Sequence, residues 1–362
     1  MVRISSHQLF TLALAFEIGS TTIFVLGIEA KQDAWLVIIL ATLIGIASTW
    51  IYTKLQNNFP NNNYSEIIIK ILGSKLGTPL AVLYCCEWFW HSARNLREFG
   101  ELIIITTLPN TSLILICSLI SLVSAYTLTK GIESLARASE ILLPIIVIFL
   151  ITSYILIFIS KNADLKNITP FFAGGLKPII KAVPEVVMFP FGESLVFNMY
   201  FNLANRKEKV SKTMLLVILL SGIILCCSTI VIILSLGAKY ASIATIPLVE
   251  AIRLVNIGDI ITNIDAVGVT IIFLGGFFKI CTYAGGTIMG INTIFNIKNR
   301  KVTVVVFHLI LLVFSIKFEP SYAYHKWMFP FDINNFAIYY SNLFPLLLIG
   351  ILWIKKRRAK QG

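Results

Sequence analysis

Long runs of apolar residues, separated by shorter polar connections, make up most of this chain of 362 residues. A helix needs about 20 consecutive apolar residues to cross the hydrocarbon core of a bilayer. The pattern reaches that length ten times and predicts an all-α, multi-pass integral membrane protein with ten transmembrane helices. The predicted helices cover about 9–28, 34–53, 78–105, 110–128, 136–159, 182–201, 212–236, 262–291, 302–318 and 333–354.

The connections between these helices are too short to contain a soluble domain, so residues 1–362 are predicted to form a single membrane domain. Hydrophobic residues make up 57% of the chain and charged residues 13%. A soluble protein of this length could not bury so much apolar surface. With no soluble module, we predict no enzyme, no catalytic residue, no cofactor and no metal site. The six cysteines all fall within apolar runs, which indicates small core residues rather than a disulfide framework.

The net charge of +12 could suggest a nucleic-acid partner, but the positions of the basic residues reject it. Most Lys and Arg residues fall on one side of the predicted membrane when the N-terminus is placed in the cytoplasm. That bias follows the positive-inside rule and predicts that both termini are cytoplasmic. The basic tail KKRRAK is predicted to meet anionic lipid headgroups, or alternatively to serve as a stop signal after the last helix.

Ten helices divide into two groups of five, and an odd number in each group inserts the second group in the opposite sense. This arithmetic predicts a 5+5 inverted repeat, with a first repeat at about 9–159 and a second at about 182–354. Such folds interrupt the first helix of each repeat. Helix one contains FEIGSTT from Phe16, and helix six contains FPFGES from Phe189. Glycine and proline both weaken helices, so the two helices are predicted to be broken near mid-membrane. Unwound backbone there would line a binding site, and the alternative for each break is a packing kink.

The third predicted helix carries a stripe of ionisable residues that lipid would not tolerate. The steps between them are four, three, four and three, which places them on one helix face toward the bundle interior. Arg97 lies beside this stripe and is spaced to pair with Glu101, as Arg94 is with Glu98. These pairs are structural clamps or gates, or else ligand contacts. Glu87 and His91 are deeper and are candidates for a site, with core polar groups as the alternative. The stripe is Glu87, His91, Arg94, Glu98 and Glu101.

Helix eight adds Lys279 and Tyr283, four residues apart within FFKICTY. A buried lysine needs an acidic or carbonyl partner. The sequence offers Glu17, Glu87 and Glu193, and does not choose among them.

Six short segments together resemble one known family. They are ISSHQLF, FEIGS, AKQDAWL, ARNLREFGELI, MFPFGE and FFKICTY, in this order along the chain. The chain resembles the spore germination permease family, the B subunits of nutrient germinant receptors. That family belongs to the amino acid–polyamine–organocation superfamily, whose fold is similar to that of the leucine transporter.

The resemblance implies a site for an amino acid or similar small nutrient between helices one, three, six and eight. It also implies partner A and C subunits and a place in the inner membrane of the spore, with both termini on the core side. Carried onto this sequence, the pocket would use Gly19, Ser20, Thr21, Glu87, His91, Phe189, Pro190, Phe191, Gly192, Glu193, Lys279 and Tyr283.

Three functions are therefore expected in turn. The first is a receptor subunit that binds a nutrient and triggers spore germination through its partners. The second is an ion-coupled secondary amino acid transporter. The third is a scaffold or an ion-conducting part of a receptor complex, which the paired breaks and the charged stripe argue against.

Overall fold

A computed structural model describes residues 3–256, 265–332 and 336–359 of the chain. The described residues are helical apart from turns and one isolated backbone bridge, which confirms the all-α prediction. The α-helices are α1 (Ser6–Ile18), α2 (Ala34–Asn57), α3 (Tyr64–Leu72), α4 (Ser74–Thr106), α5 (Leu113–Lys130), α6 (Ile132–Ile159), α7 (Leu176–Met188), α8 (Val210–Ala241), α9 (Pro247–Arg253), α10 (Asp265–Ile294), α11 (Arg300–Phe318), α12 (Tyr322–Asp332) and α13 (Phe344–Arg358). Short 3₁₀ segments are η1 (Ile28–Asp33), η2 (Leu165–Ile168), η3 (Phe191–Met199), η4 (Phe201–Leu203) and η5 (Lys207–Lys209), and a π-helical turn is η7 (Tyr339–Leu343).

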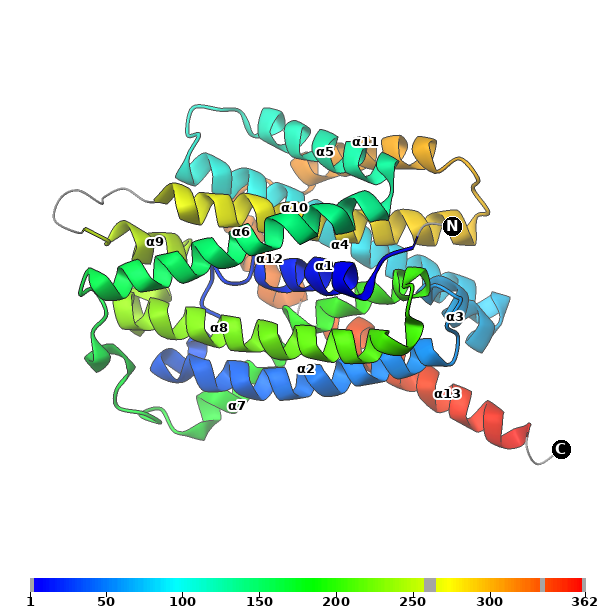
Figure 1. Cartoon of the computed structure of the whole chain (residues 1–362), viewed down its shortest axis with the longest axis horizontal. Helices are drawn as coiled ribbons and strands as arrows, with labels where there is room; N and C mark the ends of the chain where they lie inside the picture. Colours follow the sequence, from blue (N-terminus) through cyan, green and yellow to red (C-terminus); the bar gives the residue numbers. More distant parts are fainter. Residues whose placement is uncertain (1–2, 257–264, 333–335, 360–362) are drawn as a thin grey trace.

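The long helices run side by side along the molecule, with α5 and α11 at one edge and α2 and α7 at the other (Figure 1). Helix α1 lies between these edges and packs against α6, α8 and α10. Its residues from Leu12 to Ile18 are all buried. A helix that is apolar and enclosed on every side belongs in the centre of a bundle. The first helix is therefore a central element on which the others are arranged.

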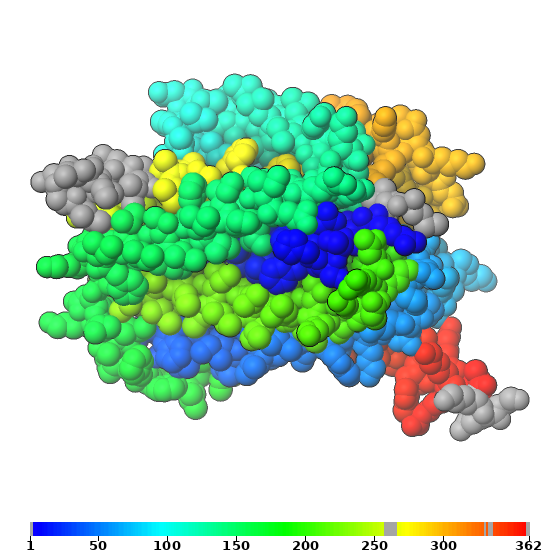
Figure 2. Space-filling view, in the orientation of Figure 1, coloured from blue at the N-terminus to red at the C-terminus, as the bar shows by residue number. Residues whose placement is uncertain are grey.

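Large apolar side chains cover the outer faces of the bundle. Leu119 and Leu122 on α5 are 55% and 65% exposed, and Ile141 on α6 and Leu309 on α11 are 69% and 60% exposed. Figure 2 shows one such face, formed largely by α5, α6, α8 and α2. Apolar surface of this extent is stable in contact with lipid tails and not in water. The outer helices thus face the hydrocarbon of a membrane.

Six helical segments are long and apolar enough to cross a membrane: Ile28–Asn57, Leu113–Lys130, Ile132–Ile159, Lys207–Ala241, Ala266–Ile294 and Arg300–Phe318. They coincide with the predicted helices two, four, five, seven, eight and nine. Predicted helices one and six fall short because α1 and α7 have only 13 residues each before they break. Helix α4 carries the ionisable stripe, and the tenth helix is divided by the π-helical turn.

The first break follows Ile18. Gly19 closes the last α-helical turn, and residues 19–27 form turns instead of a continuing helix. Ending a helix leaves backbone carbonyls without partners. The Thr21 hydroxyl donates to the Glu17 carbonyl, and the Thr22 hydroxyl donates to the Ile18 carbonyl at 2.9 Å. The small polar residues of the motif therefore satisfy the carbonyls that the break releases.

The second break follows Met188. Phe189 is extended, with φ −126° and ψ 111°, and η3 begins at Phe191. Pro190 lies between them and has no N–H to continue the α-helical hydrogen bonds. Ser194 donates from its hydroxyl to the Phe191 carbonyl at 2.7 Å. Both predicted breaks are present, each stabilised by nearby hydroxyl groups.

Three helices fall largely in segments that the apolar pattern assigns to connections. These are α3, α9 and α12, which have nine, seven and 11 residues. Each is too short to reach the length on which the prediction depends. The predicted starts of helices eight and ten, at 262 and 333, lie outside the described residues.

Candidate ligand site

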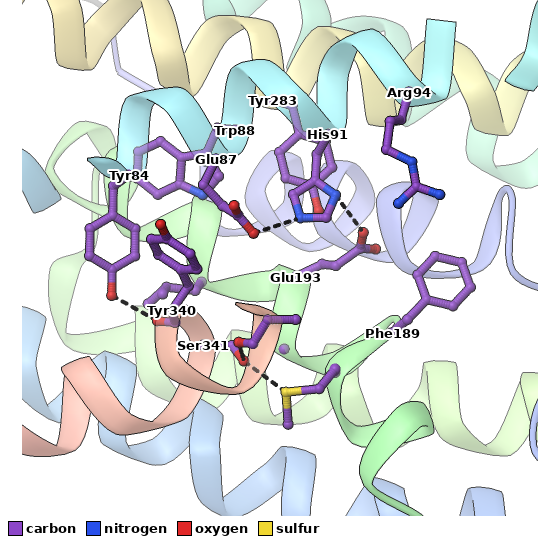
Figure 3. A pocket seen from close by; sticks show the side chains of 14 residues that line it. Tyr84, Glu87, Trp88, His91, Arg94, Phe189, Glu193, Tyr283, Tyr340 and Ser341 are labelled. Carbon is purple, nitrogen blue, oxygen red and sulfur yellow. Dashed lines mark hydrogen bonds and ion pairs between the residues drawn. The ribbon is translucent and has the colours of Figure 1, made fainter. Parts of the chain in front are cut away.

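A cavity lies between the middle of α4 and the break after α7 (Figure 3). Its volume is about 40 Å³. That is room for only a few water molecules at roughly 10–15 Å³ each. Its walls come from α4, the α7–η3 break, α10 and the segment that leads through η7. The lining residues are Tyr84, Glu87, Trp88, His91, Arg94, Met188, Phe189, Gly192, Glu193, Leu195, Tyr283, Ala337, Tyr340 and Ser341.

His91 lies between two carboxylates at the centre of this cavity (Figure 3). Its Nε2 is 3.2 Å from Glu87 Oε1, one turn earlier on α4. Its Nδ1 is 3.9 Å from Glu193 Oε1, which comes from η3. The spacing of four residues on α4 creates the first contact, and the break after α7 brings in the second. The three groups form a polar row that joins two elements of the cavity wall.

Glu193 is held in place by Lys279 of α10. The ammonium group is 2.5 Å from Glu193 Oε2, and the lysine side chain is fully buried. The same ammonium lies 4.2 Å from the centre of the Phe189 ring, which adds a cation–π contact. The structure thus selects Glu193 among the three acidic partners that the sequence offers. The pair fixes one wall of the cavity, because a buried charge is stable only with a close counter-charge.

Tyr283 supports the histidine from the other side. Its ring stacks on His91 with centroids 5.1 Å apart and an interplanar angle of 18°. Its opposite side meets Phe16 of α1 at 5.2 Å in an edge contact. The helix-eight pair Lys279 and Tyr283 therefore reaches Glu193 and His91 respectively. The first helix contributes to the site indirectly, by packing behind Tyr283.

The fourth wall comes from η7 and was not predicted from the sequence. Tyr84 donates from its hydroxyl to the Tyr340 carbonyl at 2.7 Å. Ser341 donates to Met188 Sδ at 3.1 Å. A Cβ atom added to Gly192 would lie 3.0 Å from the Ser341 Cβ and Oγ. The only signal in the sequence is the polar pair of Ser341 and the residue after it, within an otherwise apolar run.

Six predicted ligand contacts, Glu87, His91, Phe189, Gly192, Glu193 and Tyr283, line the cavity, and Lys279 reaches it through Glu193. The other predicted contacts lie elsewhere. Gly19 packs directly on the backbone of Gly275, since an added Cβ would fall 2.4 Å from the Gly275 Cα. Phe191 is buried against α2, where it fills the space beside Gly45. The remaining three, Ser20, Thr21 and Pro190, are buried at the breaks and do not line the cavity.

The helix-three ion pair nearest its end is present as expected. Arg97 lies 2.7 Å from Glu101 through its Nη2 and 3.3 Å from the Ile316 carbonyl through its Nη1. Arg97 is 6% exposed and lies outside the cavity lining. This contact joins α4 to α11, which fits a structural clamp.

The other helix-three charges belong to a network with the segment around α12. Arg94 Nε is 3.4 Å from Glu319 Oε1. His325 lies 2.8 Å from Glu319 through its Nδ1 and 3.5 Å from Glu98 through its Nε2. The network closes one side of the cavity, because Arg94 lines it. Glu319 and His325 were missed because they fall in a predicted connection.

The site offers hydrogen-bond donors, acceptors and charges, and no assembly suited to a metal. Among residues 3–256, 265–332 and 336–359, no three His, Cys, Asp or Glu side chains are grouped to hold a metal ion. The arrangement suits recognition of a small polar molecule.

Comparisons with known proteins agree on one family and one fold. The sequence model described as "Spore germination protein" matches residues 3–323. The chain is 31% identical to spore germination protein KB of Bacillus subtilis (strain 168) over 364 residues, covering 99% of this chain and 97% of that protein. Among solved structures, it is similar to MhsT in complex with L-phenylalanine, with a TM-score of 0.67, 14% identity and coverage of 94% and 87%. It is also similar to Mhp1, a nucleobase-cation-symport-1 family transporter, with a TM-score of 0.60, 13% identity and coverage of 90% and 74%.

Proposed function

The chain belongs to the spore germination protein family of multi-pass, non-enzymatic membrane proteins, and we propose that it is the membrane subunit of a nutrient germinant receptor. In this proposal it binds an amino acid or a similar small nutrient in the cavity at the α7–η3 break. Binding triggers germination through partner A and C subunits in the inner membrane of the spore.

The observation that carries the proposal is the charged cavity in the middle of an apolar bundle. Ionisable groups inside a membrane protein are costly and mark ligand or ion sites. Glu87 and Glu193 present carboxylates that suit the ammonium group of an amino acid. Arg94 presents a guanidinium to the same cavity, which suits the carboxylate group. The fold likeness to MhsT, solved with L-phenylalanine, supports the same ligand class.

The size of the cavity gives the proposal a mechanism. A volume of about 40 Å³ is smaller than an amino acid. Binding must therefore favour a conformation in which the walls have moved apart. A ligand with higher affinity for that conformation raises its population, and partner subunits respond to the change. The nutrient acts by shifting a conformational equilibrium rather than by undergoing chemistry.

An ion-coupled amino acid transporter is the second candidate, favoured by the fold likeness to the transporter Mhp1. The two functions share the cavity and differ in whether the ligand crosses the membrane. The purified chain alone in liposomes distinguishes them. Counterflow of labelled amino acid would establish transport, and saturable binding without counterflow would support the receptor function.

The proposal is tested by equilibrium binding of a panel of labelled amino acids to the chain in nanodiscs. We expect saturable binding of one ligand class, weakened at least tenfold by Glu87→Gln. Glu133→Gln is the matched control, because Glu133 pairs with Arg137 on an exposed part of α6. Equal loss in both variants, or no effect of Glu87→Gln on a bound amino acid, would contradict the assignment of the cavity.

A further inference from the structure

Glu17 is a fully buried carboxyl group that the nutrient site does not explain. Its side chain is 0% exposed at the end of α1, and it does not line the cavity. Neither carboxyl oxygen has a hydrogen-bond partner in the protein. An ionised carboxylate in such a place would lose its hydration and gain nothing in return. The neutral, protonated form avoids that cost.

The charges around Glu17 lead to the same conclusion. Two carboxyl groups, Glu17 and Glu193, lie near a single buried ammonium, that of Lys279. The ammonium is committed to Glu193 at 2.5 Å. One cation balances one anion, so the second carboxyl group is neutral when it carries a proton.

We propose that Glu17 is a proton-binding site whose occupancy is set by the partner of Lys279. While Lys279 is paired with Glu193, Glu17 holds one proton. When Lys279 loses Glu193 as a partner, its ammonium pairs with Glu17, and the Glu17 proton passes to bulk water. The total charge of the three side chains then stays balanced within the bundle.

The surroundings of Lys279 favour such an exchange. Its ammonium lies 4.2 Å from the ring centre of Phe189 and 5.4 Å from that of Phe16, the neighbour of Glu17 in the chain. Aromatic faces stabilise a cation without fixing it to one direction. The other titratable groups that act electrostatically on Glu17 are Tyr52 of α2 and Tyr283 of α10.

The link to nutrient binding rests on the proposed function. An amino acid whose ammonium group pairs with Glu193 would compete with Lys279 for that carboxylate. Nutrient binding would then release the Glu17 proton and connect the cavity to the break in α1. The chemical class of the coupled ligand is a proton, delivered or removed at one carboxyl group.

Infrared absorption of the full chain in nanodiscs tests the proton site without any nutrient. A protonated carboxyl group has a carbonyl stretching band separate from the bands of carboxylates. We expect the wild-type chain to show an acid band that Glu17→Gln removes and that Glu133→Gln leaves unchanged. Identical wild-type and Glu17→Gln spectra would show an ionised Glu17, for example one that binds an inorganic cation, and would overturn the proposal.

Glu193→Gln tests the exchange. With Glu193 neutral, Lys279 should pair with Glu17, so the acid band should disappear although Glu17 is intact. Lys279→Met gives an independent check, since both carboxyl groups then need a proton and the acid band should roughly double. An acid band that persists in Glu193→Gln, or stays unchanged in Lys279→Met, would overturn the exchange. Because these readouts need no ligand, failure of the nutrient-binding panel with a positive infrared result would reject the receptor function alone.

Discussion

The ammonium of Lys279 on α10 lies 2.5 Å from the carboxylate of Glu193 on η3, and the lysine is completely enclosed by protein. These residues are 86 positions apart in the chain. The contact joins the break in the sixth predicted helix to the eighth. It also aims the second oxygen of Glu193 at His91, so the ion pair shapes the candidate ligand site.

Removing one member of this pair should be more damaging than removing both. Lys279→Met leaves Glu193 buried without a counter-charge, and losses of about 3–5 kcal/mol are typical of such changes. We expect a lower thermal transition in detergent for Lys279→Met, partly restored in the Lys279→Met, Glu193→Gln double variant. Glu193→Gln alone should be the milder single change, because Lys279 still has Glu17. A double variant less stable than Lys279→Met would contradict this account.

Gly19 should be required for packing rather than for ligand contact. An added Cβ would lie 2.4 Å from the Gly275 Cα, which is backbone and cannot turn aside. Overpacking of a core costs about 1–3 kcal/mol, so Gly19→Ala should lower the yield of folded protein. Gly350→Ala is the matched control, since nothing lies within 4 Å of its added Cβ. Normal yield with lost nutrient binding in Gly19→Ala would instead place Gly19 in the site.

Arg97 is expected to act as a clamp between α4 and α11. Arg97→Ala removes the 2.7 Å contact with Glu101 and the bond to the Ile316 carbonyl. Protein level and thermal stability should fall, while the affinity of the remaining folded protein for nutrient should stay within about twofold. Size-exclusion yield and binding measured on the same preparation separate the two effects. A stable variant with weakened binding would move Arg97 into the ligand site.

The start of α1 and the end of α13 lie at the same end of the bundle (Figure 1). We therefore propose ten crossings, in two inverted groups of five, with both termini on the core side. A membrane-impermeant thiol reagent should label Lys166→Cys and Lys209→Cys from opposite sides of the membrane. Both lysines are exposed in the wild-type chain. Labelling of both positions from one side would contradict this topology.

Much of the fold follows directly from the sequence. Continuous apolar runs predict helices such as α2 and α6 because lipid and core both require apolar surface along their whole length. Gly19 and Pro190 mark the two breaks because their backbone chemistry acts locally. Helix α3 was missed because it is short and depends on a capping box between Asn63 and Glu66 rather than on length.

The site was predictable only in part. The four-residue steps of α4 place Glu87 and His91 on one face, and this local geometry was correctly read. The partner of Lys279 could not be chosen, because the choice among three acidic residues depends on how distant helices pack. Ser341 was missed for the same reason, since no spacing rule places η7 against the α7–η3 break.

The most direct test of the central claim compares two leucine substitutions in nutrient binding. At Gly192 a Cβ already lies 3.0 Å from Ser341, so Gly192→Leu should fill the cavity. At Gly350 the same substitution meets nothing within 4 Å. We predict saturable amino acid binding by the wild-type chain and by Gly350→Leu, and at least a hundredfold loss in folded Gly192→Leu. Undiminished binding in folded Gly192→Leu would show that the nutrient binds elsewhere and would contradict the account.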